Sequence, residues 1–386
     1  MGQVKVLIHA DVIEDVAREQ VETIKDSPAF KGLIAIMPDV HAGAGCVIGF
    51  TGKFDKAVIP NVVGVDIGCG VSCYKLGQCD ILYDVLDKKI REVVPLGFNN
   101  QPNRKWMNKL DKGLLDEIGA IDFDACVFYG NYPEVEQSSE PVAQLGTLGG
   151  GNHFIEIDVD SAGNKYLIVH SGSRNFGLKV ANYFQKKAKQ LCKDMLIETG
   201  KDLEYLPMKV GGSDYIKWLH VAQKYAHLNR KVITKNILNA IGITFDEGRY
   251  FESVHNYISG KDGVVRKGAI SAHVGEQVII PLTMADGCVL GKGKGVSKYN
   301  YSAPHGAGRT AGRKEMQRRL ANPGNSLITM KNFEDRMDGI YSTSISSKTI
   351  DESPFAYKHY DSIRKHVEET VDVEMIIKPV YNLKSE

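Results

Sequence analysis

The 386-residue sequence lacks any apolar run long enough to cross a membrane, and it lacks an excess of either charge. A membrane-spanning helix needs about 20 apolar residues, so we expect no such helix here. Lysine and arginine number 48 against 47 aspartates and glutamates, which gives a net charge of +1. Any surface that binds nucleic acid must therefore be local, because the overall charge does not favour it.

Paired cysteines and a secretion signal are also missing. The seven cysteines form no C-x-x-C pair, and the first ten residues lack the charged-then-apolar pattern of a signal peptide. Unpaired cysteines are typical of a reducing compartment. We therefore expect a cytoplasmic protein with no membrane partner.

Several common catalytic motifs are absent as well. The sequence contains no G-x-x-x-x-G-K-[ST] loop, no G-x-G-x-x-G fingerprint, no H-E-x-x-H and no G-x-S-x-G. A serine hydrolase is therefore unexpected, and any nucleotide must be held by something other than the common nucleotide-binding loops.

Helical and strand-like patterns alternate along the chain, which favours a mixed α and β protein. We find no repeat, low-complexity tract or linker, and the candidate site residues run from position 66 to 305, so residues 1–386 are predicted to form a single domain. The clearest helices are predicted at 11–25 (with Asp11 and Glu14 as a capping box), 81–94, 105–118, 180–198, 213–240, 315–320 and 363–370. Strands are predicted at 33–37, 58–65, 71–76, 154–158, 166–170, 250–258, 263–273, 277–283, 287–290 and 373–380.

The segment Gly64–Gly70 carries a carboxylate and a thiol three residues apart, Asp66 and Cys69, among glycines. An oxygen and a sulfur ligand on one short turn suit a borderline divalent metal such as zinc or manganese. An isolated D-x-x-C is more often a buried cysteine near a turn. Here, however, glycine- or serine-flanked histidines follow.

Those histidines are His153, after the glycine run Gly149–Gly151, His170, at the end of an apolar strand, and His255. The glycines leave backbone amides open to phosphate oxygens, although a plain glycine-rich loop is the alternative. His220 and His227 lie on the long predicted helix and are expected only to pack there. Four others (His9, His273, His359 and His366) are assigned no role.

A fifth segment, Pro304-His305-Gly306-Ala307-Gly308-Arg309, begins the densest arginine cluster, which continues to Arg313, Arg318 and Arg319. Arginines suit bidentate phosphate contacts. A neutral histidine nitrogen can attack phosphorus when cations offset the developing charge. The alternative is a solvated basic helix after a turn.

In this order, these segments resemble the RtcB family of GTP-dependent RNA ligases. The resemblance also covers Met37-Pro38-Asp39-Val40-His41 and Ala356-Tyr357-Lys358, and it rests most on the combination of G-G-G-N-H-F and H-G-A-G-R. It implies an α+β fold, a single large domain with a central β-sandwich-like core flanked by helices. It also implies ligation of RNA 3′-phosphate or 2′,3′-cyclic phosphate ends, such as those of tRNA or rRNA fragments, to 5′-hydroxyl ends. GTP and two manganese ions would be used through a histidine–GMP intermediate.

The resemblance assigns roles by position. His305 would accept GMP; Cys69 would bridge the two manganese ions, one completed by His170 and His255 and the other by Asp66 and His153. The remaining implied residues contact the nucleotide (Asn152, Glu156, Thr283, Cys288, Ala307, Tyr357 and Lys384), lie near the RNA ends (Asp39, with a catalytic role, and His41) or hold RNA phosphate (Arg174, Arg309 and Arg313). A small archease-type activator assists some members of the family.

The chain departs from the family pattern at three places. Cys288 stands where serine is usual, Ala44 replaces a tyrosine in H-x-G-Y-G, and Lys384 is followed by Ser385-Glu386. These changes suggest a diverged bacterial paralogue. Two alternatives stay open: a binuclear metallophosphoesterase that hydrolyses cyclic phosphates without ligation, and a non-catalytic RNA-binding relative.

Overall fold

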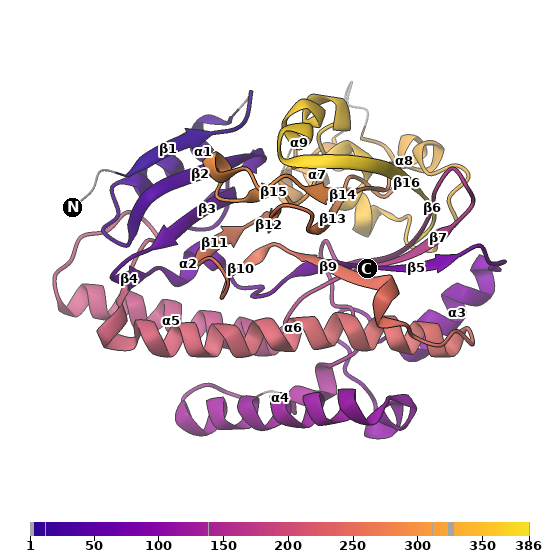
Figure 1. Ribbon diagram of the computed structural model, residues 1–386, viewed down its shortest axis with the longest axis horizontal. Coiled ribbons are helices and arrows are strands. Elements are labelled where there is room, and N and C mark those ends of the chain that lie inside the picture. Colours follow the sequence, from indigo (N-terminus) through magenta and orange to yellow (C-terminus); the bar gives the residue numbers. More distant parts are fainter. Residues whose placement is uncertain (1–3, 12, 138, 311, 323–327, 386) are drawn as a thin grey trace.

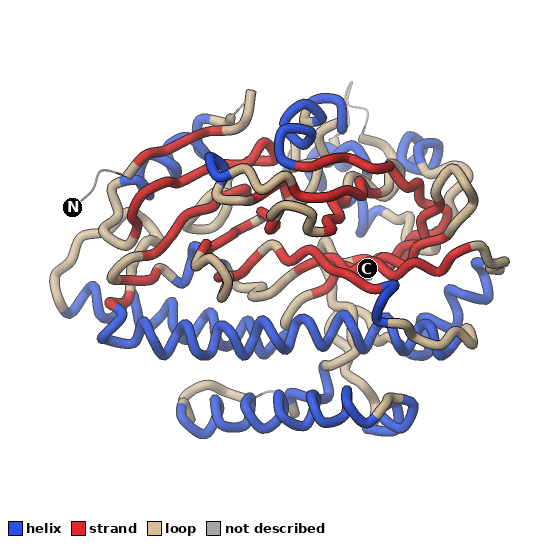
Figure 2. Tube along the Cα trace, in the orientation of Figure 1, coloured by secondary structure: helices blue, strands red, loops and turns tan. Residues whose placement is uncertain are grey.

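Strands and helices are segregated into layers in the computed structural model, which describes residues 4–11, 13–137, 139–310, 312–322 and 328–385. Two β-sheets lie side by side above long helices (Figures 1 and 2). The predicted α+β class is confirmed. No helix within the described ranges is long and apolar enough to cross a membrane. The expectation about the first ten residues falls partly on residues 1–3, which lie outside these ranges.

The smaller main sheet has five strands in the order β1-β2-β3-β11-β10. Only β1 and β2 run parallel; the other neighbours are antiparallel. Its strands are β1 (Lys5–Ile8), β2 (Phe30–His41), β3 (Ile48–Phe54), β10 (Asn256–Ile258) and β11 (Val264–Lys267).

The larger sheet has seven strands in the order β13-β14-β16-β6-β7-β5-β9, all antiparallel. Its two edges meet, since the Ile279 amide of β13 donates a hydrogen bond to Ser253 Oγ of β9 at 3.0 Å. The sheet therefore curls almost closed and encloses a core of its own. Its strands are β5 (Gly70–Gly77), β6 (Phe154–Val159), β7 (Lys165–Ser171), β9 (Tyr250–Val254), β13 (Gln277–Pro281), β14 (Cys288–Gly293) and β16 (Val371–Lys384). Two short pairs add β4 (Ala57–Val58) with β8 (Leu206–Pro207) and β12 (Ala269–Ser271) with β15 (Ser302–Pro304).

The helix α6 spans the length of the molecule beneath both sheets (Figure 1) and contacts β5, β7 and β10. Apolar residues of α6 belong to the core under each sheet, so this helix joins them. The helices are α1 (Asp15–Lys25), α2 (Pro60–Val63), α3 (Tyr83–Val93), α4 (Lys112–Asn131), α5 (Arg174–Asp194), α6 (Ser213–Ala240), α7 (Arg313–Ala321), α8 (Met330–Arg336) and α9 (Arg364–Thr370).

The bounds of α6 confirm the prediction for 213–240, but three local predictions are wrong. In the range 58–65, Val58 ends the two-residue strand β4 and Pro60–Val63 form α2, because Pro60 suits the first helical position. The first helix begins at Asp15, and Glu14 precedes it without a capping bond from its side chain. A 3₁₀ turn, Arg104–Lys109, and α4 replace the helix predicted at 105–118.

Candidate active site

Four of the predicted metal ligands lie at the ends of strands in the seven-stranded sheet. Cys69 precedes β5, His153 precedes β6, His170 lies near the end of β7 and His255 follows β9. These strands are neighbours in the order β6-β7-β5-β9 and run antiparallel. The first residues of β6 and β5 therefore lie beside the last residues of β7 and β9. The sheet register therefore gathers residues that are 186 positions apart.

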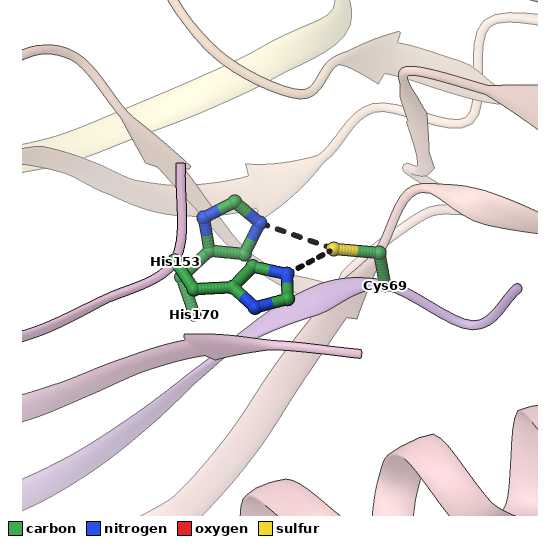
Figure 3. Close-up of side chains that lie close together, drawn as sticks. All are labelled: Cys69, His153 and His170. Carbon is green, nitrogen blue, oxygen red and sulfur yellow. Dashed lines mark hydrogen bonds between the residues drawn. The ribbon is translucent and has the colours of Figure 1, made fainter. Parts of the chain in front are cut away.

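The ligand atoms converge on the Cys69 sulfur. Its Sγ lies 3.3 Å from His170 Nε2 and 3.5 Å from His153 Nε2, as Figure 3 shows. Asp66 Oδ2 lies 3.0 Å from His153 Nε2, and the His170 and His255 rings are 5.1 Å apart. The five predicted ligands thus form one cluster.

The hydrogen bonds of this cluster fit metal binding. His153 Nδ1 donates to the Leu148 carbonyl at 2.9 Å, and His170 Nδ1 donates to the Asn152 carbonyl at 3.2 Å. Each bond fixes the tautomer that leaves the Nε2 lone pair facing Cys69. Among the described residues, the buried Nδ1 of His255 has no hydrogen-bond partner. Burial lowers the pKa values of His170 and His255, so both are neutral and able to coordinate a metal.

His305 follows β15 directly and lies beside this cluster, its ring 4.8 Å from that of His255. Asp39, on β2, is fully buried, and its Oδ2 accepts bonds from His305 Nδ1 at 2.6 Å and from the His305 amide at 3.1 Å. A proton held on Nδ1 leaves Nε2 as the nucleophilic nitrogen. Asp39 therefore contacts His305 and does not line the pocket itself.

A pocket opens in front of His305 and the metal-ligand cluster. It is lined by most of the residues predicted from the sequence: His41, Asp66, Cys69, Asn152, Glu156, His170, His255, Thr283, His305, Ala307, Arg309, Arg313, Tyr357 and Lys384. The structure therefore brings the candidate nucleophile, metal ligands and nucleotide contacts into one cavity.

Comparison with known proteins gives a family match over most of the chain. The family profile of "tRNA-splicing ligase RtcB" matches residues 20–385. The chain belongs to the RtcB family. It is 31% identical to the RNA-splicing ligase RtcB of Escherichia coli (strain K12), over 96% of this chain and 95% of that protein. It is 28% identical to the tRNA-splicing ligase RtcB of Thermococcus kodakarensis, over 92% of this chain and 88% of that protein. The resemblance inferred from the motifs is confirmed.

In this RtcB-family chain, Glu156 reaches the pocket from the interior of the curled sheet. Its Oε2 accepts a bond from Asn382 Nδ2 at 2.5 Å. Burial raises the pKa of Glu156 to about 7, and burial also raises that of the neighbouring Asp158. The two buried carboxyl groups lie together, so burial favours the protonated form in this pair more than in an exposed carboxyl group.

Glu352, which the sequence reasoning missed, connects the polar side chains of the pocket. It is buried, and it accepts bonds from Tyr357 Oη at 2.5 Å and Arg309 Nη1 at 3.1 Å. Arg313 Nη1 lies 2.7 Å from Glu352 Oε1, and Lys384 Nζ lies 3.3 Å from Oε2. Burial alone would raise the pKa of Glu352, but the nearby Lys384 and Arg313 lower it, so this group is ionised.

Two residues of α6, Asn229 and Arg230, were also missed. Asn229 Oδ1 accepts from the Gly146 amide at 2.8 Å, and so fixes the loop before the glycine run. Arg230 is fully buried and donates to the Gly68 and Ser171 carbonyls at 2.7 and 2.9 Å. Both side chains hold the loops that carry the metal ligands. Both are polar residues of a long helix that carries many others, and nothing local in the sequence marks these two as buried.

Three predicted site residues lie differently from their expected roles. Cys288 is fully buried in the core inside the curled sheet, beside Asp158 and behind the lining residue Glu156, and it does not line the pocket itself. Arg174 is directed toward the loop before the glycine run, because Nε donates to Thr147 Oγ1 at 3.0 Å and Nη2 to the Gly97 carbonyl at 2.8 Å. Burial lowers the pKa of His41 to about 4, so His41 is neutral at pH 7.

Proposed function

We propose that this protein is an RNA ligase that joins RNA 3′-phosphate or 2′,3′-cyclic phosphate ends to 5′-hydroxyl ends, with GTP as the energy source. Residues 1–386 would form one catalytic domain. The observation that carries the proposal is the placement of His305, with its Nδ1 held by Asp39 and its ring 4.8 Å from the metal-ligand residue His255.

The reaction would begin at His305 Nε2. This nitrogen would attack the α-phosphorus of GTP, so that an N–P bond forms, the α–β P–O bond breaks and pyrophosphate leaves. The Nδ1 proton would stay hydrogen-bonded to Asp39, which stabilises the positive charge that develops on the ring. Transfer of GMP to the RNA 3′-phosphate would then give the attacking 5′-hydroxyl a good leaving group.

Metal use fits the donor set, because one thiol, one carboxylate and three imidazoles converge, and hydrogen bonds fix the tautomers of His153 and His170. Cys69 would be shared between two manganese ions, with His170 and His255 on one side and Asp66 and His153 on the other. Bound ions would supply positive charge to the phosphate oxygens during the transfer. Asp39 holds His305, the residue that would accept GMP, beside this cluster.

The nucleotide would lie along the pocket beyond His305. The carboxylate of Glu156 would accept hydrogen bonds from the guanine edge, which would favour GTP over ATP. The other lining residues would contact the nucleotide: Asn152, Thr283, Ala307, Tyr357 and Lys384. Cys288 would contribute only through the core that supports Glu156, given its burial.

RNA phosphates would meet Arg309 and Arg313 at the pocket. His41 would act there as a hydrogen-bonding group and not as a cation, because it is neutral. Arg174 would act indirectly, through the loop that carries His153. All seven cysteines are free thiols, which supports a location in the reducing cytoplasm. An archease-type activator stays a prediction.

The test is incubation with α-labelled GTP and manganese, followed by a denaturing gel. We expect an acid-labile, alkali-stable label on the wild type and none on His305→Ala. The variant His359→Ala, at an exposed histidine outside the pocket, should label normally. The proposal fails if no label forms on protein shown to hold manganese; GTP-independent turnover of cyclic-phosphate RNA by His305→Ala would favour the phosphoesterase.

A further inference from the structure

A second cluster of metal-binding side chains lies outside the pocket, where the segment after β1 meets α9. It consists of His9, His366 and Glu369, and a ligand atom from each lies within 4.8 Å of the others. His9 is tied to β2 by its amide, which donates to the Ile36 carbonyl at 2.8 Å. His366 and Glu369 are three residues apart on α9 and so share one helix face.

The spacing of this cluster fits a tetrahedral zinc site. His9 Nε2 lies 3.3 Å from Glu369 Oε2, and His366 Nδ1 lies 4.0 Å from Glu369 Oε1. Zinc bonds of about 2.0–2.2 Å at tetrahedral angles place neighbouring ligand atoms about 3.3–3.6 Å apart. The first distance already matches, and a small rotation of the His366 ring would close the second.

The imidazoles of His9 and His366 are buried, and their ring nitrogens lack hydrogen bonds within the described part of the chain. His9 is 5% and His366 is 8% exposed, and among the described residues none of their four ring nitrogens has a hydrogen bond of acceptable geometry. Buried polar nitrogens are rarely left unpaired. Atoms that bind one ion lie close together, but their lone pairs point at the ion and not at each other. Short contacts without hydrogen-bond geometry are therefore expected among the ligands of a shared metal.

The surroundings orient the ligands as in known metal sites. Tyr299 Oη donates to Glu369 Oε2 at 2.7 Å, and the Tyr299 ring stacks on His9 with centroids 3.9 Å apart. Asp11 Oδ2 lies 3.1 Å from His366 Nε2, so a carboxylate also lies close to the second nitrogen of this ring. Burial lowers the pKa of His9 to about 4, so its ring is neutral. Lys298, 3.7 Å from Glu369, opposes a cation, but its side chain is largely exposed to solvent.

We propose that His9, His366 and Glu369 bind a zinc ion that fastens the N-terminal segment to α9, separately from the catalytic site. Two imidazoles and one carboxylate are a ligand set that zinc favours, with a water as the fourth ligand. The site would be structural, since it lies away from the pocket lining.

The test must separate this zinc from metal in the catalytic cluster. The full-length double variant Cys69→Ala/His170→Ala removes two catalytic ligands and serves as the background. After equilibration with zinc and gel filtration, we expect about one zinc per chain. Adding His366→Ala should reduce this to below about 0.2, whereas adding His359→Ala, at an exposed histidine nearby in the sequence, should leave it unchanged.

Glu369→Gln, added to the background, keeps an acceptor for Tyr299 and so decides the question if His366→Ala does not fold. We expect it to weaken zinc binding at least tenfold and to remove the rise in Tm that zinc produces. Cobalt bound to the background should show d–d absorption without a thiolate charge-transfer band. The proposal is overturned if the background holds no zinc, or if Glu369→Gln binds zinc as the background does.

Discussion

The carboxylate of Asp39 is predicted to set the rate at which His305 accepts GMP. In the structure Oδ2 of this fully buried side chain receives both the Nδ1 proton and the backbone amide of His305. Asp39→Asn keeps an acceptor oxygen of the same size in the same place but removes the negative charge. It therefore tests the charge and leaves the geometry nearly intact.

The expected size of the effect follows from the hydrogen bond. A bond to a charged group contributes about 1.5–3 kcal/mol, against about 0.5–1.5 kcal/mol for a neutral one. The difference of about 1–2 kcal/mol would be felt as the ring becomes positive, and each 1.36 kcal/mol is a factor of about ten in rate. We therefore expect guanylylation to slow about 5- to 30-fold.

The assay is the single-turnover rate of label transfer from α-labelled GTP at saturating GTP and manganese. The matched control is Asp361→Asn, which alters an exposed aspartate 3.2 Å from His359, another Asp–His pair; its rate should equal that of the wild type. Asp39→Ala, which also leaves the His305 amide without its acceptor, should be slower than Asp39→Asn. A wild-type rate for Asp39→Asn would refute the role given to this carboxylate.

Three further predictions concern other parts of the site. Gly149→Ala should abolish metal binding, measured as bound manganese, because φ is +93° and a Cβ would lie 2.1 Å from Arg174 Nη1 and 2.7 Å from His153 Nδ1; wild-type occupancy would contradict this. Glu156 should ionise near pH 7, so calorimetric GTP affinity should rise with pH through 7, because the carboxylate form accepts the guanine donors; Glu156→Gln should remove this rise, and a persisting rise would exclude Glu156 as its source. Glu252→Gln should lower unfolding free energy by about 3–5 kcal/mol in urea melts, because it leaves the buried Arg230 without its partner at 2.9 Å; a loss under about 1 kcal/mol would contradict this.

The family resemblance predicted that these five side chains belong to one ligand set, and the structure places them close together. Four of them also adjoin or lie in a strand whose apolar pattern is visible locally, and Asp66 lies in the turn before β5. Cys69 and His153 precede strands, and His255 follows one, so the pattern alone indicates that they lie at strand ends. Pattern does not say which strands are neighbours. The convergence of these ends depends on the order β6-β7-β5-β9, which only the folded sheet supplies.

Each of the missed residues has at least one partner that is far away in the sequence. Glu352 meets Arg309, 43 positions away, and Arg230 meets Gly68, 162 positions away. His9 and His366 come from opposite ends of the chain. A buried ionic group has no periodic signature of its own, because its position is specified by the partner that offsets its desolvation.

The pocket reconciles a nearly neutral chain with a polyanionic substrate. Arg309, Arg313 and Lys384 gather around Glu352, with Asp351 Oδ2 2.7 Å from Arg313. Three cations thus face two carboxylates, and the carboxylates hold the cations in place before any phosphate arrives. Preorganised charges need little reorganisation when a phosphate binds, which is where electrostatic stabilisation is most effective. The positive charge that phosphate chemistry requires is therefore local, at the cations that gather around Glu352 in the pocket, and the overall charge of +1 does not reveal it.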